Sequence, residues 1–320
     1  MKTTHRLLLA ATALALSGFA AFAAPEDEES PQRAGKGEII QHRPNPNEGG
    51  PHMAWGAAPT AGSTSKLSTP LTYHHGPVFS TPTAYLIWYG NWNQSNGTDT
   101  PAGQAIVTDF FHAIGGSPYF QINTTYVGSS NAISGNVTYG GATSMAYPHG
   151  VSLSDATIQT IVGDAIAGGL GPAGGDTNGI YFVLTSSDVN ESSGFCTQYC
   201  GWHYWGTING RNIKYSFIGN AARCITACAA QSIGPNGNAG VDGMVSVLAH
   251  ELEEATTDAD GSAWYNRQGY ENGDACAWTF GTSYKVNNGA YANMKLGARD
   301  FLIQRNVTIR SNGQYCSLVK

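Results

Sequence analysis

Apolar and polar residues alternate in two different patterns along the chain from about residue 71 onward. Short, nearly continuous apolar runs that are bounded by glycine or polar residues predict strands buried in a sheet. The run at 84–89, for example, is aromatic and aliphatic and stops at Gly90. Strands are expected at 84–89, 137–139, 179–184, 213–218 and 301–303.

Three longer stretches carry apolar residues at intervals of three and four, which is the spacing of an amphipathic helix. Glycine pairs at 115–116 and 168–169 close the first two stretches. Helices are expected at 102–114, 153–167 and 241–257. Because strands and helices interleave, the pattern predicts an α/β or α+β fold, a single domain with a central mixed sheet over residues 71–320.

The N-terminal part differs in character from the rest of the chain. A short basic start precedes an apolar stretch at 7–20 and a small-residue cleavage pattern at 21–23, so residues 1–23 are expected to be a signal peptide. The alternative is a membrane anchor, but the apolar stretch is shorter than the roughly 20 residues that a helical span needs. Residues 24–70 have few aliphatic side chains, and we expect a disordered segment or a propeptide there.

Charge and composition narrow the range of partners. Charged residues make up 12% of the chain, the net charge is −6, and no cluster of lysine and arginine stands out. A nucleic-acid partner is not expected, because neutralising phosphates requires a basic face. No later segment is apolar over the length of a bilayer, so no membrane span is expected in the mature protein. These features together predict a secreted protein, extracellular or periplasmic.

Six cysteines also point to export: Cys196, Cys200, Cys224, Cys228, Cys276 and Cys316. An even number of cysteines in an exported chain predicts disulfides, and six cysteines allow fifteen connectivities, between which the sequence does not choose. The alternative is a structural zinc site, because the first four cysteines form two C-x3-C pairs. An oxidising space argues against the free thiolates that such a site needs.

The third helix carries the candidate chemistry. His250 and Glu254 are four residues apart, so they share one face of the helix, where an imidazole and a carboxylate can bind one metal ion. In H-E-x-x-H helices, the glutamate after the first histidine takes a proton from the metal-bound water. The pattern here is H-E-x-x-E. It predicts a zincin-like active-site helix with His250 and Glu254 as zinc ligands and Glu251 as the general base.

A third ligand is expected from the segment that follows this helix. Glu271 and Asp274 both lie at a distance from Glu254 similar to that in thermolysin-like gluzincins, where a downstream glutamate is the third ligand. Either residue is therefore a candidate metal ligand. Asp258 is expected to hold the His250 ring through its other nitrogen.

Two alternatives apply to this acidic helix. A run such as Glu251, Glu253 and Glu254 is commonly a solvated helix face, although Leu248 and Leu252 bracket it and would draw it toward the core. If a metal binds, several carboxylates with one histidine make a harder and more anionic site than two histidines do, so calcium or manganese are alternatives to zinc. Such a site also acidifies its bound water less, which would weaken peptidase activity.

Motifs along most of the folded part resemble the EXORDIUM / phosphate-induced protein 1 (PHI-1) family of secreted plant proteins linked to cell expansion. The motifs include LTYHHGP at 71–77, LIWYGNW at 86–92, GVDGM at 240–244 and AHEL at 249–252. The family pattern includes the glutamate four residues after the histidine. The resemblance implies secretion and an extracellular role, and it implies no mechanism.

Other histidines have two interpretations each. His74 and His75 precede a strand, and they either join a site or lie on the polar surface. His203 stands between Trp202 and Tyr204, where it either lines a cleft that binds sugar or belongs to a packed aromatic cluster.

Two hypotheses follow for the function. The first is a secreted zinc-dependent hydrolase, a metallopeptidase that acts on a peptide or protein substrate. The second is a non-catalytic extracellular protein that binds cell-wall carbohydrate or a protein partner, with the acidic cluster holding a structural cation or none. The two hypotheses predict different effects of Glu251→Gln. A structural site tolerates this substitution, whereas a hydrolase loses its turnover.

Overall fold

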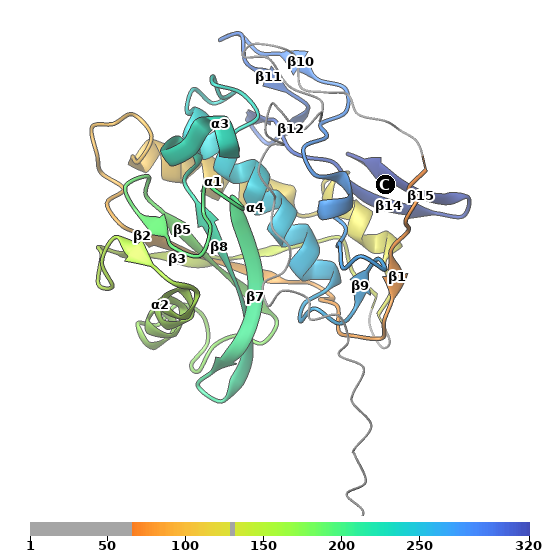
Figure 1. Cartoon of the computed structure of the whole chain (residues 1–320), viewed down its shortest axis with the longest axis horizontal. Helices are drawn as coiled ribbons and strands as arrows, with labels where there is room; N and C mark the ends of the chain where they lie inside the picture. Colours follow the sequence, from red (N-terminus) through yellow and green to blue (C-terminus); the bar gives the residue numbers. More distant parts are fainter. Residues whose placement is uncertain (1–65, 129–131) are drawn as a thin grey trace, which may run out of the picture. The chain divides into compact units, whose positions relative to one another are not determined.

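A five-stranded mixed sheet forms the centre of the fold in a computed structural model, which describes residues 66–128 and 132–320 (Figure 1). The strand order is β3-β2-β5-β8-β7, in which β7 is an antiparallel edge strand and all other neighbours pair in parallel. The strands are β2 (Thr83–Tyr89), β3 (Thr138–Met145), β5 (Gly179–Thr185), β7 (Gly201–Ile208) and β8 (Arg211–Gly219). The expected α/β fold with a central mixed sheet is confirmed.

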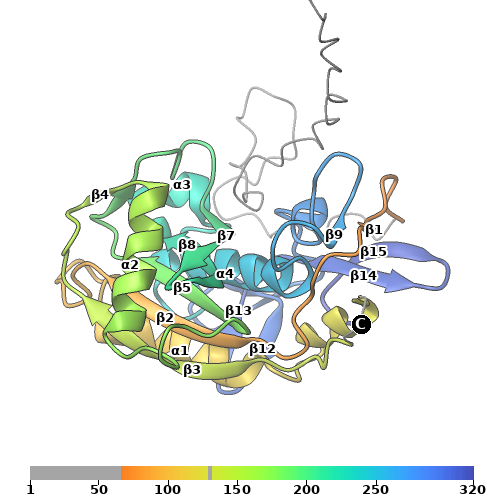
Figure 2. The same cartoon turned by 90° about the horizontal axis from the view of Figure 1, so that it is seen from below.

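Three long helices pack on this sheet, namely α1 (Pro101–Ile114), α2 (Asp155–Ala167) and α4 (Ala239–Thr257). Helix α2 contacts β5, β7 and β8, while α1 packs against α4 on the opposite side of the sheet (Figures 1 and 2). Side chains alternate between the two faces of a strand. Tyr215 on β8 donates a hydrogen bond to Gln159 of α2, so the next residue of β8, Ser216, and its partner His203 on β7 face α4.

The ends of the helices follow from local chemistry. Thr100, Ser154 and Asn238 precede α1, α2 and α4, and each side chain accepts a hydrogen bond from a free N–H group of the first turn. The three helices agree with the expected ranges to within two residues. No helix in the described ranges 66–128 and 132–320 combines the length and apolar character that crossing a bilayer requires.

The β7–β8 hairpin was not anticipated as a whole, because only its second strand was expected. The two strands are joined by Asn209 and Gly210, which have φ angles of 51° and 75°. Two residues with positive φ at this place match the tight hairpin turn that Asn-Gly favours. The Asn-Gly dipeptide just before the expected strand was therefore the local signal for β7.

The segments after α4 form short pieces rather than one sheet. Strand β9 (Trp264–Tyr265) pairs with β1 (Thr72–Tyr73), and the single turn η3 (Asp274–Cys276) follows. Three further antiparallel pairs complete the chain: β10 (Tyr284–Lys285) with β11 (Tyr291–Ala292), β12 (Met294–Leu296) with β13 (Arg299–Phe301), and β14 (Asn306–Arg310) with β15 (Gly313–Ser317). The strand expected at 301–303 is instead β13, which ends at Phe301, and the β14–β15 hairpin was not anticipated.

The remaining elements are short connections between the layers. They are η1 (Phe120–Thr125), β4 (Ser152–Leu153), β6 (Asn190–Glu191), η2 (Ala221–Cys224) and α3 (Ile225–Cys228). The described chain starts at Lys66, which pairs with Tyr315, and the N–H of Leu67 donates to the carbonyl of Gln314. The last residues of the expected N-terminal segment thus contact β15. The expected signal peptide lies outside the described residues.

Three disulfides join the six cysteines, as the even cysteine count predicted. They are Cys196–Cys224, Cys200–Cys228 and Cys276–Cys316. The first two join the loop before β7 to η2 and α3, and the third joins η3 to β15. Because the four cysteines of the two C-x3-C pairs are disulfide-bonded, they do not provide the thiolates of a zinc site.

Candidate metal centre

Helix α4 is buried almost along its whole length. Every residue after Ala239 is buried, and the side chains of Glu251, Glu253 and Glu254 are 0% exposed. The alternative of a solvated acidic face is therefore wrong. A carboxylate in such a place must be paired, protonated or bound to a cation, because burying an isolated charge is very costly.

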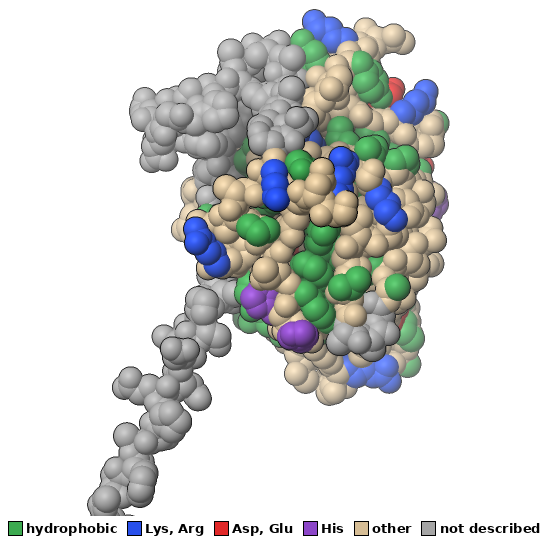
Figure 3. Space-filling view, turned by 90° about the vertical axis from the view of Figure 1, so that its right-hand side faces the viewer, with side chains coloured by type: hydrophobic (Ala, Val, Ile, Leu, Met, Phe, Trp, Pro, Cys, Tyr) green, Lys and Arg blue, Asp and Glu red, His purple; other side chains and the backbone are tan. Residues whose placement is uncertain are grey.

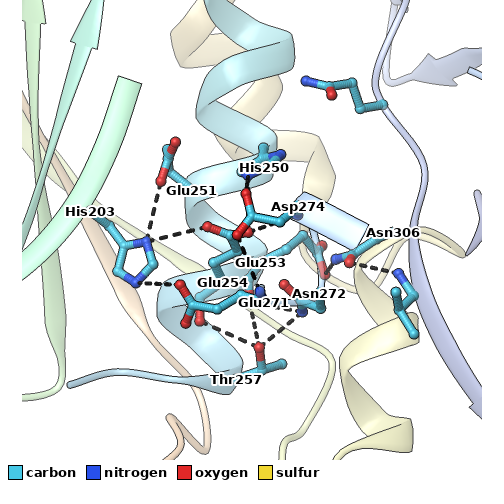
Figure 4. Close-up of polar contacts among 12 residues, drawn as sticks. His203, His250, Glu251, Glu253, Glu254, Thr257, Glu271, Asn272, Asp274 and Asn306 are labelled. Atoms are coloured by element: carbon cyan, nitrogen blue, oxygen red, sulfur yellow. Dashed lines mark hydrogen bonds and ion pairs between the residues drawn. The ribbon is translucent and has the colours of Figure 1, made fainter. Parts of the chain in front are cut away.

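The two ligands expected on the helix meet one of the expected loop residues. The Nε2 atom of His250 lies 3.0 Å from Oε1 of Glu254 and 3.4 Å from Oδ1 of Asp274 (Figure 4). The backbone N–H of Asp274 donates to the same Glu254 oxygen over 3.0 Å. This hydrogen bond holds η3 against the last turns of α4 and brings Asp274 into the site.

His203 of the edge strand β7 enters the cluster from the other side (Figure 4). Its Nδ1 atom lies 3.2 Å from Oε2 of Glu251 and 3.6 Å from Oε2 of Glu254, and the residue is 1% exposed. The sequence interpretation placed His203 in a sugar cleft or an aromatic cluster. It did not connect His203 with the helix, because the contact depends on the pairing of β7 with β8.

Glu271 lies on the His203 side of the cluster. Its Oε2 atom is 3.6 Å from Nε2 of His203, and its backbone N–H donates to Asp274 over 3.2 Å. The two candidates for a third ligand therefore have different neighbours, Asp274 beside His250 and Glu271 beside His203. Gly273 between them packs against the His250 ring, where a Cβ atom would lie only 2.8 Å from ring atoms.

Two other acidic residues of the helix region have different surroundings. Glu253 points away from His250, and its Oε2 accepts a hydrogen bond of 2.7 Å from Asn306 of β14. Asp258 follows the last residue of α4, and its carboxylate accepts a hydrogen bond of 2.6 Å from the N–H of Ala263. The expected role of Asp258 behind His250 stays a prediction.

The electrostatics of the cluster favour a bound positive charge. Burial raises the pKa of both Glu254 and Glu251. The nearby Asp274 carboxylate raises the pKa of Glu254 further. Burial alone would lower the pKa of His250, but the surrounding carboxylates, with Glu254 first, raise it well above its usual value. All three directions are those expected where buried carboxylates lie close together and little positive charge surrounds them.

Hydrogen bonding within the protein leaves part of this cluster unsatisfied. No hydrogen-bond partner among the described residues is found for Nδ1 of His250, Nε2 of His203, Oε1 of Glu251 and Oε2 of Glu254. Within this cluster, two groups of three residues come close enough to hold an ion, namely His203 with Glu251 and Glu254, and His250 with Glu254 and Asp274. Imidazole and carboxylate together suit zinc or manganese, whereas calcium takes oxygen ligands.

His74 and His75 are not part of this cluster, because both side chains are exposed. The His74 ring stacks on Tyr265, with ring centroids 3.7 Å apart and planes 3° apart, where β1 pairs with β9. Figure 3 shows the face of the protein that lies on the right in Figure 1, near β1, β9, β14 and β15. Lysine and arginine side chains are scattered over this face and acidic ones are scarce.

The fold and the site together define a class of protein, namely a disulfide-bonded α/β protein with a buried histidine–carboxylate cluster beside its central helix. Three disulfides fit an extracellular protein. The phosphate-induced protein 1 conserved region matches residues 71–298, which is most of the described chain. The chain thus belongs to the phosphate-induced protein 1 family, which includes the EXORDIUM-like proteins, as the sequence motifs predicted.

Proteins similar to this chain include several from plants. Protein EXORDIUM-like 3 of Arabidopsis thaliana is 31% identical over 81% of this chain and 83% of its own length. Protein EXORDIUM-like 5 of the same plant is 30% identical over 73% of this chain and 74% of its own length. Protein PHOSPHATE-INDUCED 1 of Nicotiana tabacum is 29% identical over 61% of this chain and 67% of its own length. No solved structure matches the chain significantly.

Proposed function

We propose that this chain is a secreted, non-catalytic protein whose buried cluster holds divalent metal, with zinc as the first candidate, to stabilise the fold. The observation that supports this most directly is the closure of the cluster. His203, His250, Glu251, Glu254 and Glu271 are at most 1% exposed, and the Asp274 side chain is 5% exposed. A substrate needs an approach to the metal, and these side chains are covered instead.

The surroundings of Glu251 support the same proposal. A general base must reach the proton of a metal-bound water over hydrogen-bond distance. Here Oε2 of Glu251 faces the Nδ1 atom of His203 at 3.2 Å, and the residue is 0% exposed. This contact supports a role for Glu251 as a partner of His203 or as a metal ligand, and the zinc-hydrolase hypothesis is the competing one.

A bound cation would offset the cost of burying several carboxylates together. Binding to the folded state alone stabilises a protein by about 2.7 kcal/mol when the free metal is at 100 times its dissociation constant, and by about 4.1 kcal/mol at 1,000 times. We expect a gain of this size in the free energy of unfolding when the stripped mature protein is refolded with zinc rather than with a chelator. Urea unfolding with metal analysis by elemental mass spectrometry measures both quantities.

Variants at neighbouring glutamates separate the two hypotheses. Glu253→Gln is the matched control, because Glu253 is equally buried on the same helix but bonds to Asn306 outside the cluster. We expect no zinc-dependent cleavage of a mixed peptide library by the wild-type protein. Zinc-dependent cleavage that Glu251→Gln abolishes and Glu253→Gln preserves, with unchanged metal content, would overturn the proposal in favour of the hydrolase. A wild-type protein that retains no metal after refolding would refute both.

A further inference from the structure

Glu254 divides the cluster into two halves. Its Oε1 atom lies 3.0 Å from Nε2 of His250, whereas its Oε2 atom lies 3.6 Å from Nδ1 of His203. The two imidazoles approach the carboxylate from different elements, α4 and β7, and from different sides (Figure 4). A carboxylate with one oxygen in each half is able to bridge two cations.

Each half contains one imidazole nitrogen and two carboxylates. The first half consists of His203, Glu251 and Glu254, and the second consists of His250, Glu254 and Asp274. The distances from each imidazole nitrogen to its carboxylate oxygens are between 3.0 and 3.6 Å. Ligand atoms bound tetrahedrally at about 2.1 Å from one zinc ion are about 3.4 Å apart, so the spacing in both halves suits one ion each.

The charges of the cluster also match two ions. The buried carboxylates are Glu251, Glu254, Glu271 and Asp274, which carry four negative charges when ionised, while the neutral imidazoles carry none. One divalent cation leaves two of these charges uncompensated in a buried place, whereas two divalent cations balance all four. Buried carboxylates and histidines, with a carboxylate shared between two ions, also form the di-iron and di-manganese centres of helix bundles, although here Glu251, Glu254 and Asp274 are the only carboxylates in the two groups.

Glu271 completes the arrangement by orienting one histidine. Its carboxylate lies 3.6 Å from Nε2 of His203, which is the ring nitrogen opposite the first half. Metal-binding histidines commonly donate their other ring N–H to a carboxylate, which fixes the tautomer and the orientation of the ring. Glu271 would act as a positioning residue for His203, rather than as a third ligand of the His250 half, once this 3.6 Å separation closes to hydrogen-bond distance.

We propose that the cluster binds two divalent cations that share the Glu254 carboxylate, one in the His203 half and one in the His250 half. This inference rests on the proposed metal-binding function and extends it by the number of ions and their bridge. The protein is unfolded with its disulfides intact, stripped with a chelator and refolded with Mn²⁺. Bound manganese is then measured by elemental mass spectrometry, and the coupling between ions by electron paramagnetic resonance.

The expected result is two manganese ions per wild-type chain with the spectrum of an exchange-coupled pair. His203→Gln and His250→Gln should each reduce the content from two ions to one and abolish the coupling, while Glu253→Gln should keep both ions coupled. One ion per wild-type chain would overturn this inference and leave the proposed function standing, whereas no ion would overturn both. Two uncoupled ions in the wild-type protein would refute the shared carboxylate, and this measurement needs no variant to fold.

Discussion

The Cys276–Cys316 disulfide connects the candidate metal centre to the C-terminal hairpin. Cys276 ends the turn η3, in which Asp274 is the first residue, and Cys316 belongs to β15. Replacing both cysteines by alanine should therefore have two effects. It should lower the global stability of the protein, and it should make the position of Asp274 less fixed. The matched control is the pair Cys196–Cys224, in which neither cysteine is within three residues of the cluster.

The loss of stability follows from the lengths of the closed loops. The sequence separations are 40 residues for Cys276–Cys316 and 28 for Cys196–Cys224, which correspond in the chain-entropy treatment to about 3.9 and about 3.6 kcal/mol at 25 °C. The two double variants should thus lose nearly the same free energy of unfolding. Any difference between them in metal retention must then come from the position of the cysteines and not from global stability.

Urea unfolding and metal content after dialysis against a weak chelator measure the two effects separately. We expect the Cys276→Ala/Cys316→Ala protein to lose metal at chelator concentrations that the control variant withstands, because its Asp274 is no longer tied to β15. If the two variants lose equal stability and also retain metal equally, the reasoning that the disulfide holds the candidate ligand Asp274 in place is wrong.

Two further predictions concern residues away from the cluster. Burial raises the pKa of Asp242 to about 6 despite hydrogen bonds from Asn236, so the folded state binds this proton more tightly than the unfolded state does. The free energy of unfolding should therefore decrease as the pH rises from about 4 to about 6, by at most about 1.4 kcal/mol per pH unit. Asp242→Asn should flatten this slope when both proteins are unfolded in urea. Equal slopes in the two proteins would contradict the raised pKa of Asp242. Gly210→Ala should lower the free energy of unfolding by about 1 kcal/mol in the same assay, because residue 210 has a φ of 75°. Asn209→Gly, the control, should change it little. Equal losses in the two variants would show that the positive φ at residue 210 does not limit stability.

Much of the fold could be predicted from short-range patterns. The buried runs around Leu86 and Phe182 are strands, and the three amphipathic stretches are helices, because each pattern repeats at the period of its element. The edge strand β7 escaped prediction because its residues 201–208 mix aromatic, polar and glycine positions without a clear alternation. The disulfide pairing could not be predicted either, since connectivity depends on which loops meet in space.

The residues of the candidate site could likewise be predicted only in part. His250 and Glu254 could be placed together from their spacing of four residues on one helix. Glu271 and Asp274 could be proposed from their position after the helix, although only the folded chain distinguishes their neighbours. His203 could not be assigned, because it reaches Glu251 across 48 residues of sequence through the register of the β7–β8 hairpin.

The complete burial of α4 has a consequence for how metal would be acquired. The helix lies in the part of the protein expected to open only on global unfolding, since buried core elements have the highest local opening free energies. As long as the Cys276–Cys316 disulfide is intact, ions held there would exchange at the rate of unfolding rather than by diffusion through the surface. The identity of the metal would then be decided in the compartment where the chain folds, and later changes in the surrounding metal supply would leave the mature protein unchanged.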